Sequence, residues 1–177
     1  LLLLANGFED VEALATRDIL VRGGLEIIDA SINDSLDVLS SHKVIVKADR
    51  LLKDIDINEF DFLILPGGGL GVQNLLKSAL VDDVVHAFMK NNHLVCAICA
   101  APMVLGKLGY LKGRNYTCFA GCNEGLIGNY TAKEVEIDGN IITGRSMKYS
   151  VVFGLTILEK VAGLEIKNKV ATAINGL

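Results

Sequence analysis

The amino-acid sequence predicts an α/β protein with a mostly parallel sheet, helices on both faces and a small antiparallel appendix. Three observations support this prediction. Short apolar runs alternate with helical patterns along the chain. The runs are continuous, which is typical of parallel strands buried on both faces. A strand pair within residues 36–48 and a late hairpin indicate the antiparallel part.

The expected elements follow in order from the apolar patterns. In the first half these are a strand over residues 1–5, a helix from about residue 9 to Gly23-Gly24, and strands over 25–30, within 36–48 and over 62–65. In the second half these are helices over about residues 71–78 and 80–91, a strand over 94–98, a helix from about 101, a hairpin over 135–143, and helices over about 149–162 and 165–173. The hairpin is indicated by Asp138-Gly139-Asn140 between two apolar runs.

Composition favours a soluble single domain spanning residues 1–177, with hydrophobic residues at 51% of the chain. Seventeen basic and 21 acidic residues give a net charge of −4, without a basic stripe, so nucleic acid is not an expected partner. No window reaches the roughly 18 apolar residues of a membrane span, and the apolar run at residues 1–4 is short for a signal peptide. We therefore expect a cytoplasmic protein with no membrane partner, whose four cysteines are reduced thiols.

Ligand sites of parallel sheets lie outside the carboxyl ends of the strands, so the residues that follow each strand matter most. The most informative is Cys99, which stands in a run of small residues at a strand-to-helix turn, 97–101 (AICAA). This is the pattern of a nucleophile elbow, with Cys in place of Ser. The N-terminus of the following helix would favour the thiolate. A buried, inert thiol is the alternative.

Other cysteine chemistry has less support in the sequence. Cys96 and Cys99 form a Cys-X-X-Cys pair, but Cys96 falls within the predicted strand, and strand alternation directs the two thiols apart. Nothing around Cys118 and Cys122 resembles a zinc knuckle. Among the histidines, His93 stands at the far end of the same strand, about 20 Å from Cys99, and His86 stands mid-helix. Only His42, in the antiparallel excursion, is expected to approach the site.

Two further strand ends carry polar or glycine-rich segments. Glu9, Asp10 and Glu12 occupy the first turn of a predicted helix, where the helix dipole alone favours acids by about 0.3–1 kcal/mol each. A carboxyl group near a thiolate would instead have a raised pKa and could move a proton; spacing does not choose among the three. Residues 66–71 (PGGGLG) match neither a phosphate loop nor a dinucleotide fingerprint. Their backbone N–H groups could form an oxyanion site beside that of Ala100.

Taken together, residues 6–12 (NGFEDVE), 65–68 (LPGG) and 97–102 (AICAAP) resemble the ThiJ/PfpI superfamily. The similar branch is that of the parkinsonism-associated protein deglycase and its bacterial relatives, and the resemblance covers nearly the whole chain. It implies a flavodoxin-like three-layer sandwich and a homodimer. It also implies that Cys99 is an easily oxidised nucleophile with the protonated acid Glu12 beside it. Gly68 and Ala100 would supply backbone N–H groups.

Several positions depart from the family pattern. The hydrolase-like and chaperone branches have His directly after the nucleophile, where this chain has Ala100. The deglycase branch often has a pocket histidine where Cys118 stands. Family members often have a pocket or interface arginine where His42 stands.

Two further comparisons concern basic residues. Many close relatives have Gly-Pro-Gly after a late arginine, but Arg145 is followed here by residues 146–149 (SMKY), whose larger side chains would narrow or repolarise the pocket. Arg22 matches a basic residue near the family's dimer interface, although a solvated helix charge explains it equally well.

The resemblance implies a cofactor-independent cysteine enzyme, without a metal, that acts on a small carbonyl substrate. The expected substrates are α-oxoaldehydes such as methylglyoxal, as in glyoxalase III or deglycase activity. The Cys99 thiolate would attack the aldehyde, and Glu12 would act as acid and base. The alternative is a redox-sensing or stress-protective, chaperone-like protein in which Cys99 is oxidised to sulfinic acid.

Overall fold

The computed structural model describes residues 1–176 and has a seven-stranded sheet at its centre. The strands, in sheet order, are β10 (Val135–Asp138), β11 (Ile141–Gly144), β7 (Leu94–Ile98), β6 (Phe62–Leu65), β1 (Leu2–Leu4), β2 (Asp29–Ser31) and β5 (Arg50–Leu51). Neighbouring strands are parallel except β10, which is antiparallel to β11. Two small sheets stand apart from it, β3 (Asp37–Leu39) with β4 (Ile45–Lys47) and β8 (Asn115–Tyr116) with β9 (Asn129–Tyr130).

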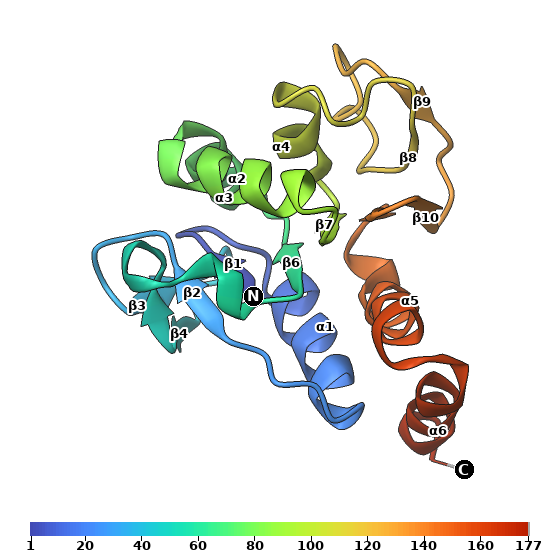
Figure 1. The fold of residues 1–177 in the computed structure, drawn as a ribbon. Helices are drawn as coiled ribbons and strands as arrows, with labels where there is room; N and C mark the ends of the chain where they lie inside the picture. The colour runs from blue at the N-terminus through green and yellow to red at the C-terminus, as the bar shows by residue number, and fades with distance from the viewer. Residues whose placement is uncertain (177) are drawn as a thin grey trace.

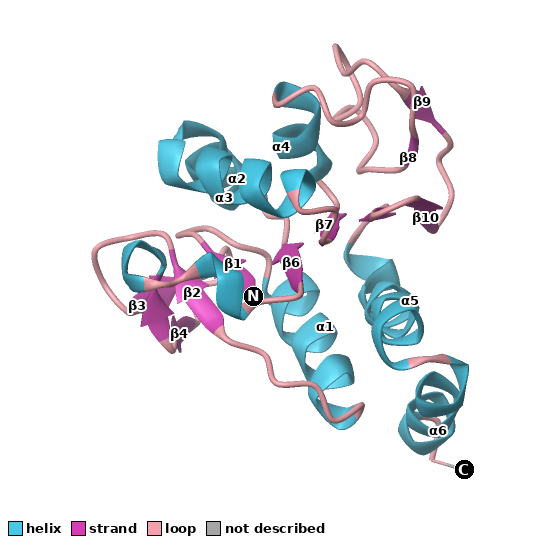
Figure 2. Ribbon diagram, viewed as in Figure 1, coloured by secondary structure: helices cyan, strands magenta, loops and turns pink. Residues whose placement is uncertain are grey.

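Helices cover the two faces of the central sheet (Figure 1). The α-helices of the described chain are α1 (Asp10–Arg22), α2 (Gly69–Lys77), α3 (Ala79–Lys90), α4 (Pro102–Lys107), α5 (Ser150–Ala162) and α6 (Leu164–Ile174). In Figure 2, α2, α3 and α4 lie together above the strands, whereas α1, α5 and α6 lie below them. The fold is therefore the three-layer, flavodoxin-like α/β arrangement that the sequence predicts.

The alternation of side chains along the strands divides the core into two clusters. Leu3, Leu63 and Val95 pack against α2, α3 and α4 on one face. Leu2 and Ile64 pack against α1, α5 and α6 on the other. Both faces of these strands are buried, so neither of the two alternating sets of side chains can be polar. The strands are therefore continuous apolar runs in the sequence.

Most of the predicted elements are confirmed, with one correction. The second strand is β2, over residues 29–31, and not 25–30. The sheet ladder extends only where β1 runs alongside, from Leu2 opposite Asp29 to Leu4 opposite Ser31, and the Ile28 carbonyl, which accepts from the Leu2 N–H (2.9 Å), marks its start. Sequence reasoning missed the short strands β5, β8 and β9, because two residues show no periodicity.

No helix within residues 1–176 combines the length and hydropathy that a bilayer crossing requires.

Candidate active site

The sheet order brings three strand ends together. Strands β7, β6 and β1 are adjacent and parallel, so their carboxyl ends open onto the same edge of the sheet. Cys99 follows β7, Gly67 and Gly68 follow β6, and Glu12 lies in the first turn of the helix that follows β1. The three segments singled out in the sequence therefore form one site.

Cys99 adopts a strained backbone conformation at a tight turn. Its φ is +63°, a region that non-glycine residues rarely occupy. The turn is held on both sides, because the Cys99 N–H donates to the Gly144 carbonyl (2.8 Å) and the Phe119 N–H donates to the Cys99 carbonyl (2.8 Å). The predicted nucleophile elbow has this geometry. Such strain persists only where the surroundings enforce it, and it is concentrated at functional sites.

Glu12 is a fully buried carboxyl group beside Cys99. Its Oε2 accepts a hydrogen bond from the Gly67 N–H (2.8 Å), while its Oε1 is buried without a hydrogen-bond partner. A Cβ added to Gly67 would lie 2.4 Å from Glu12 Oε2 and 2.8 Å from Cys99 Cβ, so acid and thiol both close around this glycine. Burial raises the pKa of Glu12 from 4.5 to about 7, against the opposing effect of its contacts with Cys99 and Gly67. Glu12 is thus poised to gain or lose a proton near neutral pH.

The same surroundings raise the pKa of the Cys99 thiol. Burial is the main cause and the nearby Glu12 carboxylate adds to it, while a hydrogen bond from the Ala100 N–H has the opposite effect. Helix α4 begins only at Pro102 and has six residues, so its dipole does not prevail over desolvation. The expected thiolate is therefore not the resting form of Cys99; it arises when Glu12 accepts the thiol proton.

Two backbone N–H groups are available to hold an oxyanion. Within residues 1–176, neither Gly68 nor Ala100 donates its N–H to another backbone or side-chain oxygen, and both residues line the cavity that contains Cys99. Gly68 has φ +95°, and a Cβ there would lie 2.3 Å from the Gly7 carbonyl oxygen, so only glycine fits. This pair can serve as the predicted oxyanion site.

The cavity at this edge has a volume of about 680 Å³ and is lined from six segments of the chain. The lining residues are Glu9, Glu12, Ser41, His42, Gly68, Gly69, Cys99, Ala100, Phe119, Cys122, Ser146, Met147 and Lys148. The segment after β11 lines the cavity with Met147 and Lys148, in agreement with the larger side chains expected there. A small carbonyl compound fits such a space.

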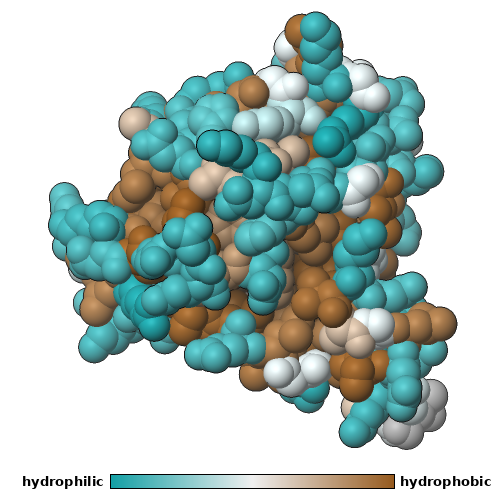
Figure 3. Space-filling model, viewed as in Figure 1, coloured by the Kyte–Doolittle hydropathy of each residue, from teal (hydrophilic) through white to brown (hydrophobic). Residues whose placement is uncertain are grey.

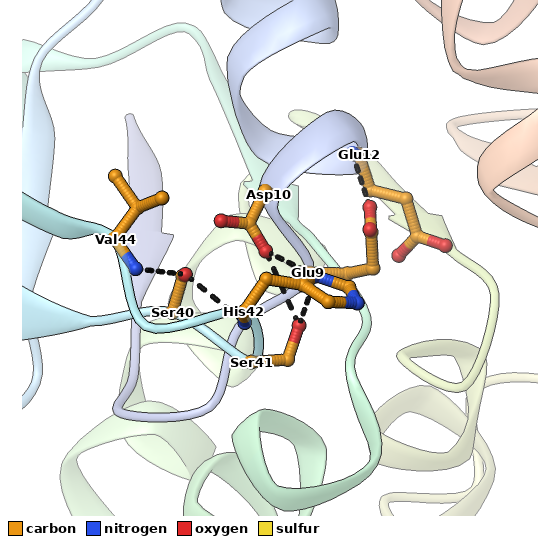
Figure 4. A network of polar contacts seen from close by, with 7 residues as sticks. All are labelled: Glu9, Asp10, Glu12, Ser40, Ser41, His42 and Val44. Atoms are coloured by element: carbon orange, nitrogen blue, oxygen red, sulfur yellow. Dashed lines mark hydrogen bonds and ion pairs between the residues drawn. The ribbon is translucent and has the colours of Figure 1, made fainter.

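A polar network flanks the cavity (Figure 4). Asp10 Oδ2 lies 2.7 Å from Nδ1 of His42 and accepts a hydrogen bond from Ser41 (3.3 Å). Although burial raises the pKa of Asp10, hydrogen bonds from Ser40, His42 and Ser41 hold it below its ordinary value. The Glu9 side chain accepts from the Glu12 N–H (2.7 Å) and so caps α1. Only Glu12 of the three acids therefore reaches the nucleophile.

Glu9, Asp10 and His42 also bring ligand atoms within 4.8 Å of one another, as a metal site requires. Their mutual hydrogen bonds and the capping of α1 account for this arrangement. The positive end of the helix dipole at the same place disfavours a cation.

The remaining predicted residues fall into two groups. Cys118 does not line the cavity, contrary to expectation; it is fully buried in the apolar core, because the chain turns outward only after it. Arg145 also stays outside the lining, with its guanidinium 4.6 Å from the centre of the Tyr149 ring and a hydrogen bond to the Ala132 carbonyl. His42 reaches the cavity as predicted. Arg22 is exposed and paired with Asp18.

The other two histidines are structural. His86 is hydrogen-bonded to the Tyr110 hydroxyl (2.6 Å), and His93 packs edge-on against Phe88.

Sequence reasoning missed Gly67, Phe119 and Cys122. Gly67 belongs to a glycine run in which spacing does not distinguish one position from the next. Phe119 and Cys122 lie in a turn-rich segment between two short strands, where no periodicity predicts which side chains face the site.

Comparison with known proteins places this geometry in a family. The model of the DJ-1/PfpI family matches residues 1–160. The chain is 34% identical over 177 residues to Protein dj-1beta of Drosophila melanogaster, which covers 98% of this chain and 95% of that protein. It superimposes with a TM-score of 0.94 on a cysteine-to-alanine mutant of a DJ-1 superfamily protein from Salmonella typhimurium, at 33% identity, over 98% of this chain and 96% of that one.

A second structure, of oxidized DJ-1 from Toxoplasma gondii, superimposes with a TM-score of 0.92 at 28% identity, over 98% of this chain and 95% of that one. The family model, the sequence identity and the shared fold agree: the chain belongs to the DJ-1/PfpI family.

Proposed function

We propose that this chain is a cofactor-independent cysteine enzyme that converts small α-oxoaldehydes, such as methylglyoxal, to 2-hydroxy acids. One observation carries the proposal. The thiol of Cys99 and the buried carboxyl of Glu12 close around Gly67, in a cavity that is also lined by Gly68 and Ala100, whose N–H groups donate to no oxygen among residues 1–176. Nucleophile, base and oxyanion donors are thereby within reach of one small substrate.

The first step depends on the protonation states of Cys99 and Glu12. With its pKa about 7, Glu12 is partly ionised at neutral pH and accepts the proton of Cys99 as the sulfur bonds to the aldehyde carbon. The carbonyl oxygen becomes an alkoxide held by the Gly68 and Ala100 N–H groups. Proton return from Glu12 gives a hemithioacetal.

The second step moves a proton between adjacent carbons. Glu12 removes the proton from the former aldehyde carbon, giving an enediolate, and returns it to the neighbouring carbon, while the hydroxyl proton of the former aldehyde carbon passes to the neighbouring oxygen. The product is a thioester between Cys99 and the 2-hydroxy acid. Water then cleaves the carbon–sulfur bond, which releases the acid and restores the thiol. Hydrolysis of early glyoxal adducts, as in a deglycase, would use the same thiol and acid.

Lactate formation from methylglyoxal without glutathione tests the proposal. We expect turnover by the wild type, and its loss in Cys99→Ser and in Glu12→Gln. Glu165→Gln is the matched control, because Glu165 is an exposed carboxylate in α6, and it should retain wild-type turnover. Absence of wild-type turnover at high protein concentration would rule the activity out.

We also propose that the protein is a homodimer in the cytoplasm. Exposed apolar side chains on α1 and α5, among them Val11, Val151 and Val152 at about 42% exposure, support an interface between copies. Figure 3 shows apolar surface gathered in the lower half of the view, where α1, α5 and α6 lie. Four free thiols accord with a reducing compartment. Light scattering after size exclusion should give twice the chain mass, and Val152→Lys should reduce it to one.

A further inference from the structure

A second thiol lines the cavity that contains the nucleophile, and the proposed turnover does not use it. Cys122 is partly exposed, free and on the same cavity wall as Phe119. We propose that Cys122 is a resolving thiol, which captures the sulfenic acid of Cys99 as an intrachain disulfide and makes peroxide oxidation of this site reversible. The proposal concerns oxidation and does not rest on aldehyde turnover.

Backbone hydrogen bonds connect the two cysteines. The Phe119 N–H donates to the Cys99 carbonyl (2.8 Å), and the Cys122 N–H donates to the Phe119 carbonyl (2.9 Å). Phe119 therefore links the two cysteines: it is hydrogen-bonded directly to Cys99, and one turn separates it from Cys122. The charge of an ionised Cys122 also contributes to raising the pKa of Cys99, which accords with their proximity.

The other two thiols are poorly placed for this role. Cys96 is fully buried within β7, and Cys118 is fully buried in the core and absent from the cavity wall. Peroxide that enters the cavity meets only Cys99 and Cys122 among the four cysteines.

The segment that carries Cys122 can move without loss of regular structure. Residues 119–128, between β8 and β9, form turns and contain neither helix nor strand. Gly121 and Gly125 both have positive φ, and a Cβ at either would meet no atom within 4 Å. Cys122 and Leu126 pack against the core on the inner side of this segment, while Gly121 and Gly125 leave its outer side open, so backbone rotation at these glycines can bring Cys122 toward Cys99.

The chemistry balances with peroxide as the oxidant. The Cys99 sulfur attacks one peroxide oxygen as Glu12 accepts the thiol proton; the O–O bond breaks, Glu12 passes the proton to the departing hydroxide, which leaves as water, and Cys99 becomes a sulfenic acid. Cys122 sulfur then attacks the Cys99 sulfur, the S–O bond breaks, and a second water leaves with the Cys122 proton. The two thiols together supply the two electrons that reduce one peroxide. A dithiol restores both.

The disulfide competes with further oxidation of Cys99. Without a neighbouring thiol, the sulfenic acid reacts with more peroxide to give the sulfinic acid, which thiols do not reduce. With Cys122 in the same cavity, the second reaction is intramolecular and independent of peroxide concentration.

Mass spectrometry of peroxide-treated protein tests this. Reduced wild type receives a stoichiometric amount of hydrogen peroxide, and remaining thiols are blocked with N-ethylmaleimide. We expect a mass loss of two hydrogens and a tryptic cross-link between residues 91–107 and 115–133. Cys118→Ala, the matched thiol control, should retain the cross-link. Cys122→Ser should lose it and accumulate the sulfinic acid at Cys99 severalfold above wild type.

Two results would overturn the proposal. One is a wild type that gains two oxygens at Cys99 while Cys122 remains open to N-ethylmaleimide. The other is a disulfide that still forms in Cys99→Ser, because Cys122 would then be paired with a cysteine other than Cys99. Thermal unfolding of each variant verifies that it is folded. This experiment measures covalent modification of the cysteines. Its outcome is therefore independent of whether the protein converts methylglyoxal.

Discussion

Replacement of Glu12 by Gln should abolish turnover and yet stabilise the protein at alkaline pH. In the folded protein, burial raises the pKa of Glu12 from 4.5 to about 7. Between these pH values the unfolded chain has released the proton while the folded protein retains it, so stability falls as pH rises. Above pH 7 both states are ionised and the loss is complete.

The size of the effect follows from the pKa difference. At 1.36 kcal/mol per pKa unit, the rise from 4.5 to about 7 corresponds to about 3 kcal/mol lost between acid and alkaline conditions. Gln has similar volume, retains an oxygen for the Gly67 N–H and carries no charge. The stability of Glu12→Gln relative to wild type should therefore increase by about 3 kcal/mol from pH 4.5 to pH 8.

Urea unfolding of both proteins across this range measures the difference. Only the difference matters, because every other titrating group is common to the two chains. Glu165→Gln should follow the wild-type curve, since this carboxylate is exposed. Parallel curves for wild type and Glu12→Gln would refute the idea that a buried, proton-holding Glu12 faces Cys99.

Three further predictions concern turnover. If Glu12 is the base, kcat/KM for methylglyoxal should fall about tenfold per pH unit below pH 7 and level off above it; a flat profile from pH 5 to 7 would exclude this role. Gly68→Ala should eliminate turnover, since its Cβ would collide with the backbone of residues 7–9, which follow β1. Gly24→Ala, also at positive φ but in open space, should keep activity at a cost of about 1 kcal/mol in chemical unfolding. Lys148 lines the cavity and has no carboxylate within 4 Å among residues 1–176; Lys148→Met should lower kcat/KM about fivefold for 4,5-dioxopentanoate, which carries a carboxylate, and leave that for methylglyoxal unchanged. Equal losses for both substrates would contradict that last expectation.

Most of the fold could be predicted from the sequence because the pattern that determines it is local. Continuous apolar runs at residues 1–5, 62–65 and 94–98 can be buried only as strands covered on both faces. Small residues on either side of Cys99 permit the tight turn that exposes a nucleophile. The strand ends that carry function were therefore recognisable before any contact was known.

The selection of residues within the site required the tertiary structure. Three acids share the first turn of α1, and only packing distinguishes them: Glu9 caps the helix, Asp10 meets His42, and Glu12 turns inward to Gly67. The protonation of Cys99 likewise depends on burial and on the Glu12 charge, which come from segments far apart in sequence.

The chain by itself thus determined the strands, the elbow and the chemical groups at its ends, since each depends on neighbours within a few positions. Long-range contacts determine the order of strands β7, β6 and β1 and the closure of Glu12 and Cys99 around Gly67. They also place Cys122, and not Cys118, on the cavity wall. Such contacts fix distance, burial and pKa, and no local pattern encodes them.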